Sequence, residues 1–139
     1  MSFEDLPPDW PCHPLTDPDL VDDVLDLCVS NADRATGGLA VLTLRDDLTL
    51  AQPMFVKGPL PRLDRRVMLS TVLGTCSREG QHTAFVIGIA HEHSALSDDD
   101  RRLHQEVIEA CGEQGLTLVS THLVTGHGIQ ALPPLRQVA

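Results

Sequence analysis

Two histidines and an aspartate near the middle of the chain have the side chains of a zinc site. His91 and His93 follow the apolar run over residues 85–90, and Asp100 comes after a short polar segment. The run predicts a buried strand. Because side chains alternate along a strand, both imidazoles are expected on one face. If Ser97 begins a helix, Asp100 lies one turn into it and can fold back toward the imidazoles. Two histidines and a carboxylate leave the fourth position of a zinc ion for water.

The same residues also have simpler interpretations, which the sequence leaves open. Histidines at the end of a strand can face solvent or bond to backbone. Ser97 and Asp100 match a capping box, in which the serine caps the helix and the acid reaches back to the N-cap amide. Asp98 and Asp99 suit the positive end of the helix dipole. Capping and metal binding do not exclude each other for Asp100.

The composition is that of an acidic, aliphatic protein. The chain has 139 residues, of which 42% are hydrophobic but only 3% aromatic, with one Trp and no Tyr. This length predicts one domain with a core of Leu, Val, Ile and Ala. The formal net charge is −10, so direct binding to nucleic acid or to an anionic membrane surface is not expected. A basic partner is the functional alternative that this acidity allows.

Cysteine usage and the chain start predict a cytoplasmic protein. The four cysteines show no C-x-x-C pairing, and they are Cys12, Cys28, Cys76 and Cys111. Free, mostly buried thiols in a reducing compartment are therefore favoured over disulfides. The N-terminus is acidic and lacks an apolar signal segment, and no apolar run approaches the ~20 residues of a membrane span.

Hydrophobic periodicity predicts the order helix, hairpin, helix, strand, helix, hairpin. A Pro-rich arm over residues 1–16, pinned by Trp10, precedes a helix that Thr16 or Asp17 caps and Pro18 begins. A polar loop over 30–38 follows this helix. The expected strands are 39–44, 48–56, 85–90, 116–125 and 129–132, and the later helices are 63–78 and 98–112. We therefore expect a single α/β domain over 17–132, built as a mixed sheet flanked by helices, with a tail over 133–139.

Helical spacing also assigns faces to the first two helices. The apolar set of the first helix is Leu20, Val24, Leu27 and Cys28, and its solvated set is Asp22, Asp23 and Asp26. The apolar set of the second is Leu63, Val67, Leu69, Val72, Leu73 and Cys76. His122 falls within an apolar strand and is expected to be an interior histidine, bonded to a neighbouring strand.

This order of elements, with H-x-H before the third helix, resembles the JAB/MPN metalloprotease fold, a cytidine deaminase-like architecture, and its RadC-type bacterial members most closely. The resemblance covers roughly residues 17–132. Its motifs are His91-Glu92-His93, Ser97-x-x-Asp100, and Thr121-His122 followed by Gly126. It implies that His91, His93 and Asp100 bind zinc and that Ser97 helps to hold the oxyanion.

The sequence departs from this family in two places. The loop between His93 and Ser97 is shorter than the family's and lacks its Pro-Ser-Gly start. The glutamate that the family uses as general base is also missing, because Gly37-Gly38 occupy its place and no glutamate lies between Glu4 and Glu79. A general base contributes roughly 10²–10⁴-fold to rate. Asp33, the nearest upstream carboxylate, lies in the expected polar loop.

The sequence therefore predicts a RadC/JAB-like domain that has lost its catalytic base. Such a domain would act as a binding or scaffolding module for a protein or peptide partner, with or without zinc. The alternative is a zinc-dependent hydrolase of amide or isopeptide bonds that uses His91, His93 and Asp100 as ligands. A third interpretation is that the resemblance is one of architecture only. An exposed edge strand could also pair two copies into a homodimer.

Overall fold

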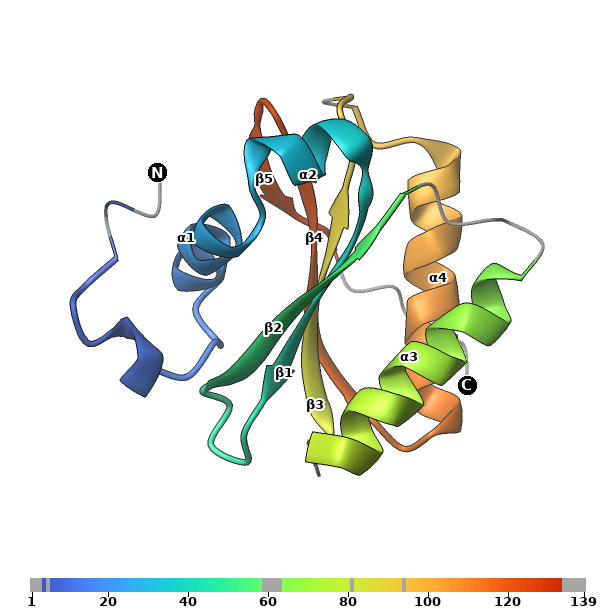
Figure 1. The fold of residues 1–139 in the computed structure, drawn as a ribbon, viewed down its shortest axis with the longest axis horizontal. Coiled ribbons are helices and arrows are strands. Elements are labelled where there is room, and N and C mark those ends of the chain that lie inside the picture. The colour runs from blue at the N-terminus through green and yellow to red at the C-terminus, as the bar shows by residue number, and fades with distance from the viewer. Residues whose placement is uncertain (1–3, 5, 59–63, 81, 94, 134–139) are drawn as a thin grey trace.

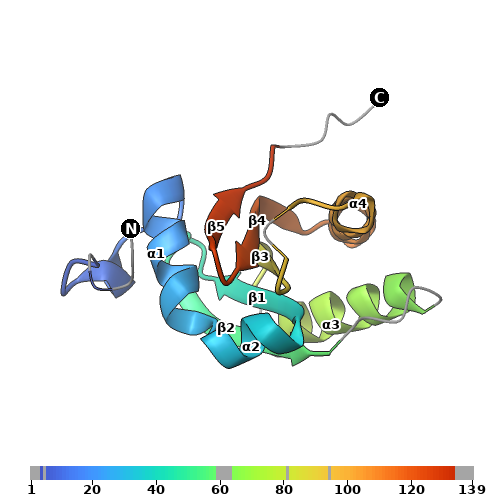
Figure 2. The ribbon, with the colours of Figure 1, turned by 90° about the horizontal axis from the view of Figure 1, so that it is seen from above.

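A five-stranded mixed sheet with helices on both faces forms the fold (Figure 1, Figure 2). The computed structural model describes residue 4 and residues 6–58, 64–80, 82–93 and 95–133. The strands are β1 (Gly38–Leu44), β2 (Leu50–Lys57), β3 (Ala84–Ala90), β4 (Thr117–Thr125) and β5 (Gly128–Ala131). The helices are α1 (Pro18–Cys28), α2 (Asn31–Thr36), α3 (Arg65–Gly80) and α4 (Asp98–Glu113), with a 3-10 turn, η2 (Trp10–Cys12), before them. The predicted α/β class with one mixed sheet is confirmed.

The strand order is β2-β1-β3-β4-β5. β1 is antiparallel to both β2 and β3, β3 is parallel to β4, and β5 returns antiparallel to β4. All seven residues of β1 and of β3 are buried, because helices cover both faces of these central strands. A parallel pair needs a crossover, and α4 provides it between β3 and β4. The end of β3 therefore leads directly to the start of α4.

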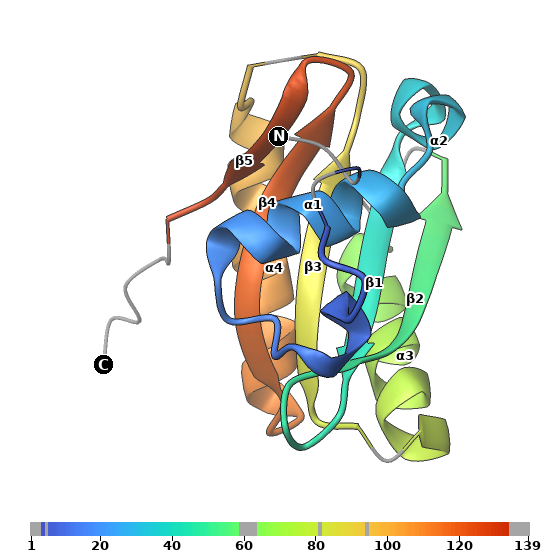
Figure 3. The same ribbon diagram turned by 90° about the vertical axis from the view of Figure 1, so that its left-hand side faces the viewer.

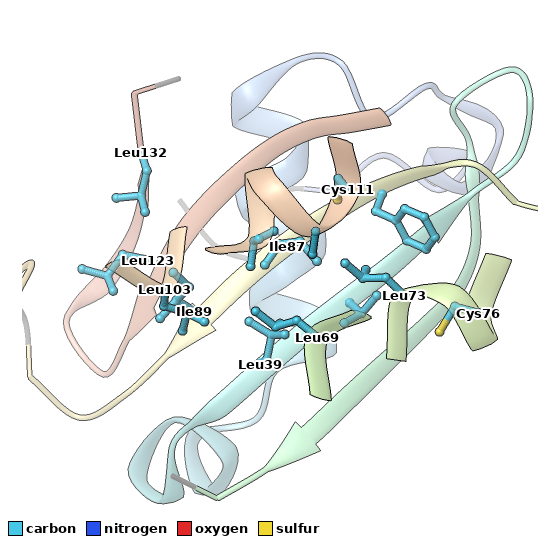
Figure 4. Packing of buried hydrophobic residues seen from close by; sticks show 14 residues of the cluster. Leu39, Leu69, Leu73, Cys76, Ile87, Ile89, Leu103, Cys111, Leu123 and Leu132 are labelled. Atoms are coloured by element: carbon cyan, nitrogen blue, oxygen red, sulfur yellow. The ribbon is translucent and has the colours of Figure 1, made fainter. Parts of the chain in front are cut away.

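Two apolar layers hold the helices on the sheet. On one face, α1 lies across the strands (Figure 3) and packs Val21, Val24 and Leu25 against alternate residues of β1 and β3. On the other face, Leu69 and Leu73 of α3, with residues of α4, pack against the remaining residues of these strands (Figure 4). The alternation of side chains along a strand explains why one apolar run serves both layers.

The N-terminal arm is attached to the α1 face. Trp10 packs against the apolar layer on this face, as expected. Leu15 is fully buried in the same layer, and its N–H donates to the carbonyl of Leu48 at 2.9 Å. Among the described residues, no helix has the length and apolar character to cross a membrane.

Two local predictions are wrong. Residues 31–36 of the expected polar loop form α2, which Ser30 caps by accepting from the amide of Asp33 at 3.0 Å. This six-residue helix has no apolar periodicity and is held by the buried Arg34, whose guanidinium donates to the carbonyl of Thr125 at 3.2 Å. The second hairpin strand was expected from Leu48, but Leu48 lies in the turn with φ 67° and β2 begins at Leu50.

Two residues of the expected apolar sets face solvent. Leu27 is 45% exposed and Val67 is 68% exposed. In α3 the fully buried residues are spaced four apart at Arg65, Leu69 and Leu73, so Val67 lies on the opposite side of the helix. Leu63, which was expected in the same set, lies outside the described residues.

Substitutions on α3 test this orientation. Leu73→Ala removes a fully buried side chain and should lower the free energy of unfolding by about 2–5 kcal/mol. Val67→Ala, the matched control on the same helix, should change it by no more than about 0.5 kcal/mol. Urea denaturation of both variants measures the difference. Equal costs would contradict the packing described here.

Candidate functional site

The end of β3 and the start of α4 bring the predicted site residues together. The strand ends at Ala90, one residue before His91, whose amide donates to the carbonyl of Val124 at 3.2 Å. His91 is half-buried and His93 is exposed. Both histidines therefore follow the strand, so strand alternation does not set the directions of their imidazoles.

Ser97 and Asp100 form the predicted capping box at the start of α4. The hydroxyl of Ser97 accepts from the amide of Asp100 at 3.0 Å, and Asp100 Oδ2 accepts from the amide of Ser97 at 2.9 Å. Asp98 and Asp99 also lie in this first turn, where carboxylates favour the helix dipole. The capping interpretation of Ser97 is confirmed.

Asp100 also contacts His91. The Nε2 of His91 lies 2.7 Å from Oδ2 of Asp100, the oxygen that caps the helix. Asp100 is 5% exposed, so this carboxylate depends on protein partners rather than water. The other ring nitrogen of His91, Nδ1, is buried and has no hydrogen-bond partner among the described residues.

The three predicted zinc ligands are neighbours but are not arranged around a common point. Tetrahedral zinc at about 2.0–2.1 Å from each ligand would hold ligand atoms about 3.3 Å apart and two bound imidazole centroids about 5 Å apart. Here His91 and Asp100 touch at 2.7 Å, and the ring centroids of His91 and His93 are 6.2 Å apart. Within the described part of the chain, no three His, Cys, Asp or Glu side chains are placed to hold a metal ion.

A cavity of about 220 Å³ lies beside His91. Its lining includes two carboxylates, Asp99 and Asp100, and the buried Arg65. Both oxygens of Asp99 accept from Nη1 of Arg65 at 3.1 Å, and Glu106 accepts from Nε and Nη2 at 2.9 and 2.8 Å. The Glu106 bonds, and then those of Asp99, raise the pKa of the Arg65 guanidinium. Arg65 therefore joins α3 to α4, and its guanidinium occupies both oxygens of Asp99.

Glycines form the cavity wall where the resemblance places the general base. Gly37 has φ 85° and Gly38 has φ 152°, which are conformations that favour glycine. A Cβ on Gly38 would lie 2.2 Å from the carbonyl oxygen of Val56, so no side chain fits there. Asp33 is not among the residues that line the cavity.

His122 is an interior histidine, as expected, but its partners differ from those predicted. Its Nε2 lies 2.9 Å from the hydroxyl of Ser120 in the same strand, and its Nδ1 lies 2.8 Å from Oδ1 of Asp22 on α1. Asp22 and Asp23 were predicted on the solvated face of the first helix, but Asp23 is 7% exposed and Asp22 lies against His122. The Ser-x-His spacing on a strand could have indicated Ser120; no sequence signal indicated Asp22.

Burial affects the protonation of this pair. It lowers the pKa of His122 to about 4 and, with the nearby Asp19 and Asp23, raises the pKa of Asp22 to about 6. Near pH 7 the imidazole is therefore neutral and Asp22 is mostly ionised.

The four cysteines, all within the described part of the chain, form no disulfide. Cys76 and Cys111 are buried, Cys28 is half-buried and Cys12 is exposed. Burial raises the pKa of the Cys111 thiol to about 11, so this thiol is a poor nucleophile at neutral pH.

Comparisons with known proteins do not assign a family. A scan against protein-family models finds no match to this chain, and a search of curated proteins also finds none.

The Asp100 contacts predict a stability effect. Asp100→Ala leaves the amide of Ser97 and Nε2 of His91 without this acceptor, and should lower the free energy of unfolding by about 1–3 kcal/mol. Asp98→Ala, in the same helical turn with its side chain 95% exposed, is the control and should cost no more than about 0.5 kcal/mol. Chemical denaturation at pH 7 measures both, and similar costs would show that the junction is not held by Asp100.

Asp22 predicts a pH-dependent stability. In the folded protein its carboxyl releases its proton near pH 6, but in the unfolded chain near pH 4. The native state therefore holds more protons between these values, so the wild type loses stability as pH rises through them. The side chain in Asp22→Asn does not titrate. Between pH 4 and pH 7, the free energy of unfolding of this variant should therefore rise relative to that of the wild type by on the order of 1 kcal/mol.

Thermal unfolding of both proteins at pH 4, 5, 6 and 7 measures this difference. Asp46→Asn, an exposed position in the β1–β2 turn, controls for simple removal of charge. A difference between Asp22→Asn and the wild type that stays constant with pH would contradict the prediction.

Proposed function

We propose that this chain is a RadC/JAB-like domain that has lost peptidase chemistry and serves as a binding or scaffolding module for a protein or peptide. The proposal is supported by the element order and the single mixed sheet, with the crossover helix α4 following the His91 strand. The contact of Asp100 with both Ser97 and His91 is further support, because these residues carry the family resemblance.

The observation that carries the proposal is the backbone at Gly37 and Gly38. The family's general base would act from this place, but both residues have positive φ and a Cβ on Gly38 would overlap the carbonyl of Val56. A glutamate therefore cannot be accommodated there without rebuilding the β1–β2 pairing. On this proposal, the loss of the base involves the backbone at Gly37 and Gly38 as well as a side chain.

The two carboxylates that line the cavity beside His91 are engaged elsewhere. Asp99 holds the Arg65 guanidinium with both oxygens, and Asp100 caps α4 and contacts His91. A general base must accept a proton from water during the reaction, and an oxygen committed to an arginine or to an N-cap amide is poorly suited to do so.

The second candidate is the zinc hydrolase, and the closeness of His91, His93 and Asp100 favours it. His91 and Asp100 would have to separate to bracket an ion, and the ring of His93 would have to approach. Zinc bound in this way would act as a Lewis acid and would lower the pKa of its water. The proton acceptor would still have to come from outside the cavity wall.

Net charge favours a basic partner for the binding module. The chain carries a formal charge of −10, and such a field attracts cationic segments and weakens with salt. A lysine- or arginine-rich peptide is therefore the expected class of ligand.

A two-part experiment tests the proposal. Zinc per chain is measured by elemental analysis, and hydrolysis of a fluorogenic peptide amide and of an isopeptide-linked substrate is followed for the wild type, His91→Ala, His93→Ala and the control Asp98→Ala. We expect no hydrolysis above that of His91→Ala, whatever the zinc content. Zinc-dependent turnover that is lost in both histidine variants but retained in Asp98→Ala would establish the hydrolase instead.

Peptide binding is the second part. Fluorescence polarisation with basic, neutral and acidic peptides of equal length should show preferential binding of basic peptides, weakened about tenfold or more between 50 and 200 mM salt for a multiply charged contact. No binding to any peptide class, together with no hydrolysis, would overturn the module proposal.

A further inference from the structure

A cavity of about 350 Å³ lies between α4 and β4, on the face of the sheet opposite α1 (Figure 2). Residues of α4 form one wall, and the first half of β4 with the segment that follows β5 forms the other. The volume and the mostly apolar lining are those of a small-molecule site. The apolar residues of the lining include Ile108, Leu116, Leu118, Val119 and Leu132.

Solvent reaches this cavity at the outer edge of β4. β5 pairs with β4 only over residues 122–125. Residues 117–120 of β4 have no strand on their outer side within the described part of the chain. Ile108 and Leu118 of the lining are half-buried and Gly112 is exposed. A small molecule can therefore enter beside α4 without displacing a strand.

His104 gives the α4 wall a polar group. It shares one face of the helix with Ile108 and Cys111, four and seven residues later, which also line the cavity. His104 is only 5% exposed, and neither ring nitrogen has a hydrogen-bond partner among the described residues. Burial lowers the pKa of this imidazole, so near pH 7 the ring is neutral and offers one donor and one acceptor. A ligand in the cavity would supply the partner that the described protein does not.

Thr121 gives the β4 wall a second polar group. It lies opposite Ile87 of β3, which belongs to the apolar layer under α3 and α4, so the Thr121 side chain points to the same face. Thr121 is 2% exposed, and its Oγ1 has no hydrogen-bond partner among the described residues. Each wall of the cavity therefore carries one buried polar side chain that these residues leave unpaired.

The charge of the lining restricts the class of ligand. No Asp, Glu, Lys or Arg of the described residues lines this cavity, although the chain carries a formal charge of −10. Moving an ion into such a space is unfavourable unless an opposite charge pairs with it. Carboxylates, phosphates and ammonium groups are therefore poor ligands here. An uncharged molecule with an apolar body and one hydrogen-bonding group complements the lining.

We propose that this cavity binds an uncharged small molecule made of an apolar ring system and a hydroxyl group, and that the hydroxyl is hydrogen-bonded to His104. The ring system lies against the apolar residues of α4 and β4. A rigid ring system suits the cavity better than a flexible chain of the same size, because it loses less conformational freedom on binding.

This site does not depend on the proposed peptide-binding function. The cavity shares no lining residue with the one beside His91. The two proposals can therefore be tested, and can fail, separately.

Three probes that share a ring system but differ in polarity test the proposal. 2-Naphthol has the hydroxyl, naphthalene lacks it, and 2-naphthoate carries a charge. Each is titrated into the whole ¹⁵N-labelled chain at pH 7.0, and the backbone amides are followed by NMR. We expect 2-naphthol to shift the amides of both cavity walls, residues 104–112 and 116–121, with a Kd of about 0.1–1 mM. Naphthalene should bind on the order of 2–10-fold more weakly, and 2-naphthoate should not bind measurably.

Variants separate a role in binding from a role in folding. His104→Leu should weaken 2-naphthol binding to the level of naphthalene and leave naphthalene binding unchanged, which a general disturbance of the fold would not do. Ile108→Trp fills the cavity and should abolish binding of both probes. His127→Leu is the matched control, because His127 is an exposed histidine outside the lining, and it should bind as the wild type does. Thermal unfolding establishes that each variant is folded, and His104→Phe replaces His104→Leu if the latter is not.

Several results would overturn the proposal. These are no shift of the wall amides with 2-naphthol, equal affinity for 2-naphthol and naphthalene, or wild-type binding of 2-naphthol by a folded His104 variant. An extended valine- and threonine-rich hexapeptide is a fourth probe. If it shifts residues 117–120 and 2-naphthol shifts none, the open edge of β4 binds a peptide strand instead, which also overturns the proposal.

Discussion

One carboxylate oxygen controls the junction on which the arrangement of the fold depends. Oδ2 of Asp100 accepts from the amide of Ser97 and contacts Nε2 of His91, so it links the residue that follows β3 to the N-cap of α4. α4 is the crossover between the parallel strands β3 and β4, and its direction is set at this junction. Because Asp100 is almost completely buried, the loss of either partner would leave a charge without compensation.

The same junction limits the chemistry of the cavity beside it. Arg65 comes from α3, carries two acids of α4 and is itself buried, so the charges nearest His91 are already paired. Gly37 and Gly38 form the opposite wall in conformations that exclude a side chain at Gly38. The Arg65 guanidinium is thus engaged by Asp99 and Glu106, and Asp100 is engaged by Ser97 and His91.

Titratable groups are distributed differently on the two faces of the sheet. At the end of β3, His91 and Asp100 contact each other at the N-terminus of α4. On the α1 face, His122 lies beside Ser120 and Asp22. A buried polar group requires a partner, but a hydrophobic residue at position 122 would satisfy the core with less cost. His122 therefore takes Ser120 and Asp22 as its polar neighbours in this otherwise apolar layer.

Local sequence determined the features that depend on neighbouring residues. The central strands β1 and β3 and the capping box of α4 are predictable because strand periodicity and N-cap hydrogen bonds act over a few residues. Tertiary structure alone decided the features that depend on distant contacts. α2 is held by Arg34 through Thr125, Val67 faces solvent because α3 is rotated toward Leu69 and Leu73, and Asp22 becomes a partner of His122.

The candidate site shows the same division. The closeness of His91, Ser97 and Asp100 follows from a strand that leads into a capped helix, and the sequence contains both signals. The separation of the two imidazoles could not be predicted from the local sequence. β3 ends at Ala90, and packing against α4 and β4 sets the path of the chain beyond it. Sequence specifies which groups can meet along the chain, and only the packing of distant elements sets their distances and orientations.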